Sequence, residues 1–232
     1  MILRDDDVVR CAQIYEVYRH ITERRSGWRA MAGIKAMIGT VLGIPNRLYN
    51  LAVLKYRGVE YDKSLVINGR IKIAGHGRIR IGKNVVINSS LSSNPIGGDI
   101  RTVFSLLNGA ELIIGDGVGI SNAAVVCHHR VVIGEGAQIG GSVRIYDTDF
   151  HTLDADRRSG ADMLEAVKKP VEIGARAFIG AHSIVLKGAV IGKGSIVGAG
   201  SVVTKRIPDH EIWAGNPARC IRKAQEGSEG SA

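Results

Sequence analysis

Residues 173–203 read IGARAFIGAHSIVLKGAVIGKGSIVGAGSVV and repeat themselves every six positions. An aliphatic residue recurs at that interval: Ile173, Ile179, Val185, Ile191, Val197 and Val203. A glycine usually follows the aliphatic residue directly, and a small residue stands four positions after the aliphatic residue. A fixed six-residue period fits neither a helix nor a plain alternating strand, and it is typical of a parallel β-helix. We therefore expect an all-β solenoid in which the aliphatic residues point inward and the glycines turn the corners.

The same period extends toward the N-terminus, with two interruptions. It begins near Leu65, slips by two residues before Ile81, and slips by one residue before Ile133. The interruptions, at about 91–110 and about 146–170, are rich in polar residues that cannot fill an apolar interior, so we expect them to leave the solenoid as loops. The sequence thus predicts three parts. They are an N-terminal helical segment (1–58), a β-helix domain (59–207) and a C-terminal segment (208–232).

Composition agrees with a globular protein of the cytoplasm. The hydrophobic content of 45% is ordinary, and 30 glycines suit a chain with many corners. The three cysteines are far apart and form no CxxC pair, which argues against a disulfide framework and against a cysteine metal site. Three aspartates at positions 5–7 stand where a secretory signal would carry basic residues, so we expect no signal peptide and a cytoplasmic location.

The N-terminal segment lacks the six-residue period and is expected to form three helices. The first two fall at about 5–25 and 28–43, and the third carries Leu48, Leu51 and Leu54 and ends at Gly58. The longest uncharged apolar run, 36–45, is about half of the roughly 20 residues that a membrane span requires. We therefore expect no helix of this segment to cross a bilayer.

Positive charge is concentrated in the same segment. The formal net charge of the chain is +9, and residues 19–57 hold eight basic residues against one acidic residue, Glu23. No nucleic-acid-binding module is recognisable, so we expect no nucleic acid partner. Two interpretations stay open. Apolar-faced basic helices suit peripheral contact with an anionic membrane surface, and they equally suit a cap on the end of the solenoid.

Two further stretches carry a resemblance to a known family. They are IYDTDFHTLDADRR (145–158) and GAGSVVTKRIP with WAGNPARCIRK (198–208 and 213–223). Together with the six-residue period, they make residues 59–223 resemble the hexapeptide-repeat acyltransferases. The first stretch resembles the catalytic loop of the sugar O-acetyltransferase branch, and the second resembles its C-terminal signature. The resemblance implies a left-handed β-helix, a homotrimer, acetyl-CoA as acyl donor, and a saccharide acceptor, as in exopolysaccharide or other surface-polysaccharide biosynthesis.

The catalytic loop of that resemblance contains the candidate general base. Transfer of an acyl group to a hydroxyl needs a base near neutral pKa, which favours His151, and Asp147 or Asp149 can orient its ring. The resemblance also implies that Arg157 stabilises the loop or faces the substrate, and that Asn122 contacts the acceptor. These are the candidate catalytic and substrate-binding residues.

The donor site is expected where neighbouring subunits meet. The resemblance places acyl-CoA along a groove between subunits, and the matching residues here are Ala181, Ala199, Thr204, Lys205, Arg219 and Arg222. Lysine and arginine are the donors that CoA phosphates require. A carbonic anhydrase branch of the same fold binds zinc through histidines, two of them separated by four residues. None of the seven histidines here forms that pair, so we expect no metal site.

The sequence leaves several alternatives open. An N-acyltransferase acting on an amino sugar, an antibiotic acetyltransferase and a non-catalytic β-helix module all remain compatible with the repeats. The length of the acyl group and the identity of the acceptor are also open.

Overall fold

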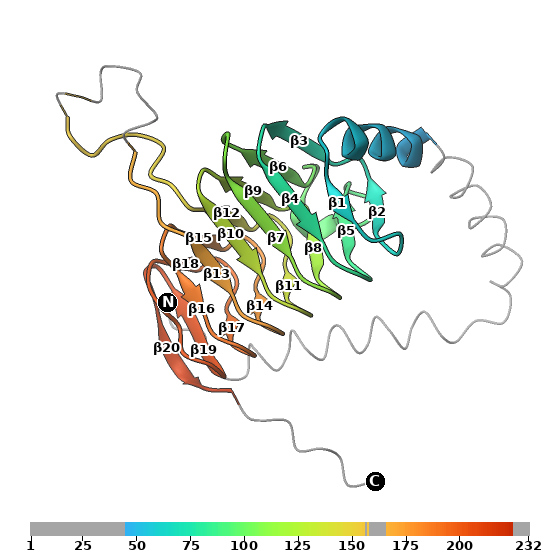
Figure 1. The fold of residues 1–232 in the computed structure, drawn as a ribbon. Coiled ribbons are helices and arrows are strands. Elements are labelled where there is room, and N and C mark those ends of the chain that lie inside the picture. Colours follow the sequence, from blue (N-terminus) through green and yellow to red (C-terminus); the bar gives the residue numbers. More distant parts are fainter. Residues whose placement is uncertain (1–44, 156, 158–165, 225–232) are drawn as a thin grey trace, which may run out of the picture. The chain divides into compact units, whose positions relative to one another are not determined.

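The computed structural model describes residues 45–155, 157 and 166–224, and these wind into a left-handed parallel β-helix of three sheets (Figure 1). Sheet A contains β1 (Glu60–Tyr61), β4 (Arg78–Ile81), β7 (Glu111–Ile114), β10 (Arg130–Ile133), β13 (Val171–Ile173) and β16 (Val190–Ile191). Sheet B contains β2 (Val66–Gly69), β5 (Val86–Ser89), β8 (Gly119–Ser121), β11 (Gln138–Ile139), β14 (Phe178–Ile179), β17 (Ile196–Val197), β19 (Glu211–Gly215) and β20 (Ala218–Lys223). Sheet C contains β3 (Lys72–Gly75), β6 (Val103–Leu106), β9 (Ala124–Cys127), β12 (Arg144–Tyr146), β15 (Ile184–Val185) and β18 (Val202–Val203).

The six-residue period sets the register between coils. Ile173 pairs with Ile191, Ile179 with Val197, and Val185 with Val203, so three six-residue units complete one coil. All six of these side chains are buried in the interior, which confirms the predicted solenoid. Burial of each such side chain is worth about 1.5–3 kcal/mol, and the stacked columns therefore supply most of the hydrophobic stabilisation.

The glycines directly after the aliphatic residues serve a different purpose from the one expected. A Cβ atom on Gly180 would lie 2.5 Å from the backbone nitrogen of Ala199 in the next coil, and the other glycines that follow an aliphatic residue are similarly crowded. Their backbone is not left-handed. The residues with left-handed backbone that turn the corners come three positions after each aliphatic residue, at Arg176, His182, Gly188, Gly194 and Gly200. The glycines directly after the aliphatic residues are thus required for close stacking of coils, whereas Gly188, Gly194 and Gly200 turn corners as expected.

The first interruption is shorter than predicted. Residues 103–106 form β6 inside the expected loop, and Phe104 is fully buried between Ile73 and Val125 of the neighbouring coils. The alternation that buries Phe104 and Leu106 has a period of two, which a search for a period of six overlooks. The loop itself covers residues 90–102 and contains the short helix η1 (Pro95–Gly97).

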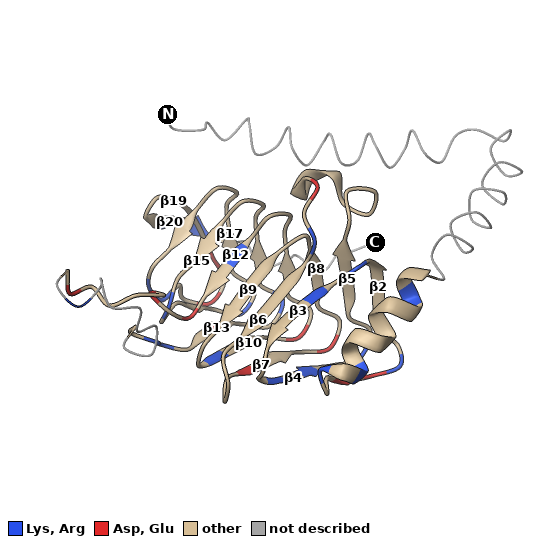
Figure 2. Cartoon of the chain, turned by 90° about the horizontal axis from the view of Figure 1, so that it is seen from above, with Lys and Arg blue, Asp and Glu red and all other residues tan. Residues whose placement is uncertain are grey.

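Residues 45–56 form the helix expected before Gly58, and it covers the first coil (Figure 2). Leu54 is buried in the core, and the Asn50 side chain bonds the backbone of residues 69 and 71 at 2.8 and 3.2 Å. Leu48 and Leu51 are exposed, contrary to a simple core-facing stripe. The two earlier predicted helices lie outside the described residues. Within the described part, no helix is long and apolar enough to cross a membrane.

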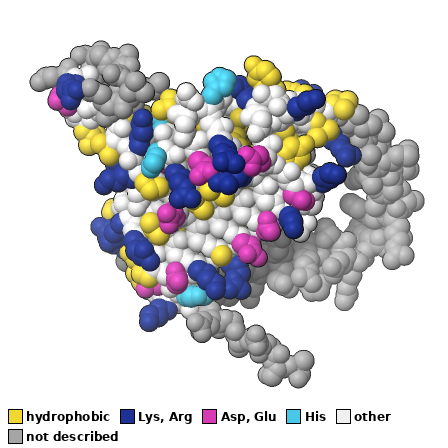
Figure 3. All heavy atoms as spheres, viewed as in Figure 1, with side chains coloured by type: hydrophobic (Ala, Val, Ile, Leu, Met, Phe, Trp, Pro, Cys, Tyr) yellow, Lys and Arg dark blue, Asp and Glu magenta, His cyan; other side chains and the backbone are white. Residues whose placement is uncertain are grey.

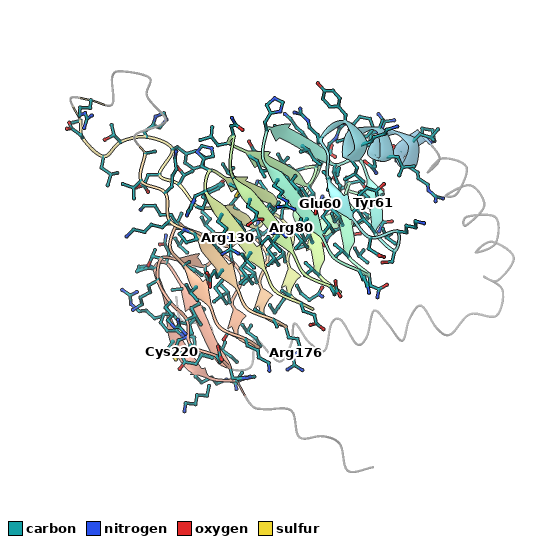
Figure 4. All side chains as sticks on the ribbon, viewed as in Figure 1. Glu60, Tyr61, Arg80, Arg130, Arg176 and Cys220 are labelled. Atoms are coloured by element: carbon teal, nitrogen blue, oxygen red, sulfur yellow. The ribbon has the colours of Figure 1, made fainter. Side chains whose placement is uncertain are left out.

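The outer faces of the three sheets differ in chemistry. Sheet A carries an ion-pair ladder, in which Arg80 and Arg130 both pair with Glu111 and Arg78 pairs with Glu60; charged side chains gather over this face in Figure 3, and several are labelled in Figure 4. Sheet B exposes apolar side chains instead, namely Val66, Val86 and Phe178. Sheet C presents half-buried Val103, Val126, Ile184 and Val202 on its outer face. Sheets B and C are therefore the faces suited to packing against another molecule.

Candidate functional site

The second interruption leaves the solenoid at the corner between sheets C and A, after β12, and returns at β13 (Figure 1). Its two ends form a narrow neck. Thr148 and Lys168 make an antiparallel bridge, the amide of Asp149 donates to the carbonyl of Val167 (3.1 Å), and the amide of Lys169 donates to the carbonyl of Asp147 (2.9 Å). The neck fixes the loop at its base, immediately before His151.

Asp147 anchors the neck to the coil beneath it. Its carboxylate is fully buried and accepts three backbone N–H groups, from His128, His129 and Arg130, at 2.7–2.8 Å. Both oxygens are therefore engaged by the corner of the previous coil. These contacts make Asp147 a structural anchor of the neck, and its role in orienting His151 stays a prediction.

Phe150 directs the chain from the neck to the candidate base. Its backbone is left-handed (φ 64°), which a bulky residue rarely adopts, and its ring packs edge-on against Tyr146 and His128. The amide of His151 donates to the carbonyl of Asp149 at 2.7 Å, and the side chain of His151 is exposed. The imidazole of His151 is thus exposed to solvent, on a strained turn at Phe150 that the neck anchors.

Asp149 lies under this turn and contacts the next coil. Its Oδ1 pairs with the ammonium of Lys187 at 2.8 Å, while Oδ2 is buried without a hydrogen-bond partner among the described atoms. Both side chains are largely shielded from solvent. Among the described residues, neither Asp149 nor Asp147 is hydrogen-bonded to the His151 ring. Asp149 remains a candidate orienting residue, and its unsatisfied oxygen can accept another donor.

Two other groups near the neck are poor catalysts. Burial, and then the neighbouring Asp147, raise the pKa of the Cys127 thiol to about 12, so it stays protonated and is a weak nucleophile. Burial is also the main cause that lowers the pKa of the His128 ring below its ordinary value, and its Nδ1 is buried without a partner. His151 is therefore the better placed base.

Asn122 belongs to the framework of the fold. It is fully buried with left-handed backbone (φ 45°), and its amide donates to the carbonyls of Gly98 and Ile100 at 3.1 and 2.7 Å. It thereby holds the 90–102 loop, while its Oδ1 is buried without a hydrogen-bond partner among the described atoms. The expected contact with an acceptor stays a prediction. Arg157 is exposed on the loop that follows the neck, and its amide donates to Asp154.

The candidate donor-binding residues lie on the last coils, in two groups. Ala181 and Ala199 stack at the corner between sheets B and C, where the amide of Gly200 donates to the carbonyl of Ala181 at 2.9 Å. Thr204 and Lys205 lie at the corner between sheets C and A, and the Lys205 ammonium sits 5.3 Å from the Trp213 ring centroid. The second group also includes Arg219 and Arg222, exposed on β20. The C-terminal segment predicted as separate therefore continues sheet B.

Within one chain, His151 and the candidate donor-binding residues Ala181 and Ala199 lie at different corners of the solenoid. The His151 loop leaves at the corner between sheets C and A, whereas the small-residue column of Ala181 and Ala199 lies at the corner between sheets B and C. Sheet C separates the two corners. A donor lying along the column can meet His151 only if another subunit supplies one of the two corners.

Sequence reasoning missed Lys187 and Phe150. Lys187 occupies a corner position that holds alanine or lysine in the other repeats, which is a weak signal, and its pairing with Asp149 depends on the register of the neck. The left-handed turn at Phe150 has no sequence signature. Within the described residues, no group of three or more potential metal-ligating side chains is present.

Comparison with known proteins finds a matching repeat model and several similar structures. Residues 170–205 match the model for the hexapeptide repeat of succinyl-transferase, while no curated protein matches the chain. The structure is similar to that of a point mutant of the N-acyltransferase AntD from Bacillus cereus, solved with dTDP-4-amino-4,6-dideoxyglucose and coenzyme A (TM-score 0.58, 23% identity, 77% of this chain and 91% of that chain covered). It is also similar to the hexapeptide-repeat acetyltransferase VCA0836 of Vibrio cholerae O1 biovar eltor, solved with acetyl coenzyme A (TM-score 0.49, 25% identity, 75% and 74% covered). A hexapeptide transferase family protein from Anaplasma phagocytophilum is a further match (TM-score 0.49, 28% identity, 72% and 80% covered).

Proposed function

We propose that this chain, whose repeat and fold are those of the hexapeptide-repeat acyltransferases, transfers an acetyl group from acetyl-CoA to a hydroxyl of a saccharide. The observation that supports it most is the anchored neck, which presents an exposed His151 on a strained turn above an ion pair. Strained backbone at a surface loop is a recurrent property of functional sites.

The proposed chemistry uses His151 as general base. The imidazole takes the proton of the acceptor hydroxyl while the hydroxyl oxygen attacks the thioester carbonyl carbon. The new C–O bond forms, the C–S bond breaks, and the imidazolium returns the proton to the departing CoA thiolate. No covalent acyl-enzyme is required, and no metal takes part in the steps.

The rival activity is transfer to the amino group of a sugar, which AntD represents among the similar structures. A panel of neutral sugars, lipid-linked saccharides and amino sugars, assayed by release of free CoA, identifies the acceptor class. Mild alkali then separates the two activities, since it cleaves an acetyl ester and leaves an acetamide intact. Alkali-stable product throughout would contradict O-acetylation, and the absence of acyl-CoA consumption with the whole panel would favour a non-catalytic module.

The protein is expected to be a homotrimer with sites shared between subunits. The apolar faces of sheets B and C and the separation of His151 from the Ala181 corner support this assembly. Light scattering should give three times the chain mass of 24.8 kDa. Phe178→Glu, on the outer face of sheet B, should dissociate the trimer and abolish activity, whereas Glu172→Lys, on the outer face of sheet A, should do neither. A stable monomer with full activity would rule out the shared site.

The basic residues at the C-terminal end are expected to bind CoA phosphates. Lys205→Ala and Arg222→Ala should each raise the KM for acetyl-CoA about tenfold, as expected for a lost charge-assisted hydrogen bond. The same variants should change the KM for acetyl-dephospho-CoA much less, because that donor lacks the 3′-phosphate. Lys193→Ala, exposed at another corner, serves as control. Equal changes with both donors would show that these side chains do not contact that phosphate.

We further propose peripheral binding of the N-terminal segment to an anionic membrane surface on the cytoplasmic side. The described part of the segment supports this, because Arg47, Leu48, Leu51 and Lys55 are exposed on one helix. Each basic residue near such a surface contributes on the order of 1 kcal/mol, so binding should weaken as salt rises.

Flotation of the full chain with phosphatidylserine-containing liposomes tests the membrane proposal. The protein should float at low salt, and Leu48→Ser with Leu51→Ser should reduce flotation severalfold. Ile221→Ser, which removes an exposed apolar residue at the other end, should leave it unchanged. If the full chain stays in solution at low salt while deletion of 1–57 lowers the melting temperature, the segment is a structural cap only.

A further inference from the structure

A hollow of about 390 Å³ lies where the helix of residues 45–56 meets the first two coils. Its walls are Tyr56, Arg57, His76, Arg78 and Asn108, and three glycines (75, 77 and 109) form its floor. None of these residues is acidic, and nothing in the expected donor site or catalytic loop uses them. We call this site the basic hollow.

The floor of the basic hollow must consist of glycine. Gly75 has left-handed backbone (φ 76°), and a Cβ atom there would overlap the carbonyl of Leu106. A Cβ atom on Gly77 would lie 2.7 Å from the side chain of the same leucine. A floor without side chains leaves backbone groups and a shallow open surface, the form suited to a flat sugar ring rather than to a deep apolar ligand.

The walls combine positive charge with an aromatic face. The Arg57 guanidinium donates to the carbonyl of Gly75 at 2.9 Å and stacks over the Tyr56 ring, 5.3 Å from its centroid. The other N–H groups of the Arg57 guanidinium remain able to donate to a ligand. Their planar arrangement matches the geometry of a carboxylate. His76 is exposed beside it, and Arg78 lines the hollow while it forms an ion pair with Glu60, which lies outside the hollow. The local charge therefore favours an acidic ligand.

The basic hollow and His151 lie along the same corner of the solenoid. The corner between sheets C and A is formed in turn by residues 75–77, 107–109, 128–129 and the loop that begins at 147. Figure 1 shows the helix and that loop rising from the same edge, at opposite ends of it. Since neighbouring strands are about 4.8 Å apart, the hollow is roughly 10–15 Å from the neck of the loop. That distance exceeds one sugar ring and suits a short oligosaccharide.

We propose that the basic hollow binds an acidic sugar unit of an oligosaccharide acceptor, whose hydroxyl then lies beside His151 further along the corner. The inference rests on the proposed function for the acceptor class. The carboxylate pairs with Arg57, the sugar ring lies against Tyr56, and Asn108 and the glycine backbone offer hydrogen bonds. The enzyme thus selects acidic chains over neutral ones of the same length.

Calorimetric binding without acyl-CoA tests the proposal independently of catalysis. The probes are a hexasaccharide of alternating glucuronic acid and N-acetylglucosamine and the same chain with its carboxyl groups reduced to alcohols. The full-length protein should bind the acidic chain at least tenfold more tightly. Arg57→Ala should remove that preference, and Lys63→Ala, an exposed cation of the first coil outside the hollow, should preserve it.

Asn108→Asp provides a variant that removes no contact of the fold, since Asn108 is exposed. The added negative charge should weaken binding of the acidic hexasaccharide about tenfold and leave binding of the reduced chain unchanged. Equal affinity of the wild-type protein for the two chains, or no effect of Asn108→Asp, would overturn the proposal. Acidic chains that bind selectively while no acceptor is acetylated would refute the proposed function and leave the hollow in place. Acetylation of small sugars without preference for acidic chains would refute the hollow alone.

Discussion

His151→Ala is expected to lower kcat for acetyl transfer at least about a hundredfold, the lower end of the loss expected for a general base. The imidazole is exposed at the end of an anchored neck, so its removal should leave the fold and the donor site intact. The KM for acetyl-CoA should therefore change little, which separates loss of chemistry from loss of binding. Steady-state kinetics with the acceptor found in the panel measure both quantities.

The control for this variant is His129→Ala. His129 is exposed at the corner of the previous coil, and only its backbone amide contacts Asp147, so its side chain can be removed without disturbing the anchor. Its kcat should stay within about twofold of the wild-type value. Near-normal turnover of the His151 variant, or equal losses in both variants, would remove His151 from the mechanism.

The solenoid itself was predictable because its physical cause is local. Each coil repeats one requirement, an aliphatic residue facing inward and a small residue behind it, so Ile173 and its successors carry the fold in their spacing. The turns at residues such as Arg176 carry no such mark, because several residue types tolerate left-handed backbone at an exposed corner. The left hand of the β-helix also has no local cause in the spacing, and it opposes the usual rule for parallel crossovers.

The candidate site was only partly predictable, since side-chain roles there depend on contacts between distant segments. Asp147 and Asp149 stand two residues apart near the same histidine, and nothing in the sequence separates them. The structure separates them by partner. Asp147 meets three amides of the previous coil, whereas Asp149 meets Lys187 of the next coil. Asn122 shows the same limit, because only the path of the 90–102 loop commits its amide to two carbonyls.

The anchor at Asp147 leads to the second large expected effect. Asp147→Ala removes the buried carboxylate that accepts the amides of His128, His129 and Arg130. Each hydrogen bond to a charged group contributes about 1.5–3 kcal/mol, and buried donors left unsatisfied add a further cost. We expect the free energy of unfolding to fall by roughly 3–5 kcal/mol. Because about 1 kcal/mol shifts the melting temperature of a domain of this size by about 2–4 °C, the melting temperature should decrease by on the order of 10 °C.

The matched control is Asp116→Ala, which removes one carboxylate that accepts a single backbone amide, that of Lys83, at an exposed corner. Its melting temperature should fall by no more than a few degrees. Because coils of a solenoid can open separately, hydrogen exchange should locate the damage. In Asp147→Ala the amides of residues 128–130 and the neck at 147–149 should lose protection, while the last coils, around Ile191 and Val197, should keep it. Activity should fall as well, since the neck no longer holds His151 at a fixed position. Similar small shifts in both variants, with protection unchanged at 128–130, would show that the three amides find water or another acceptor and that the neck does not depend on Asp147.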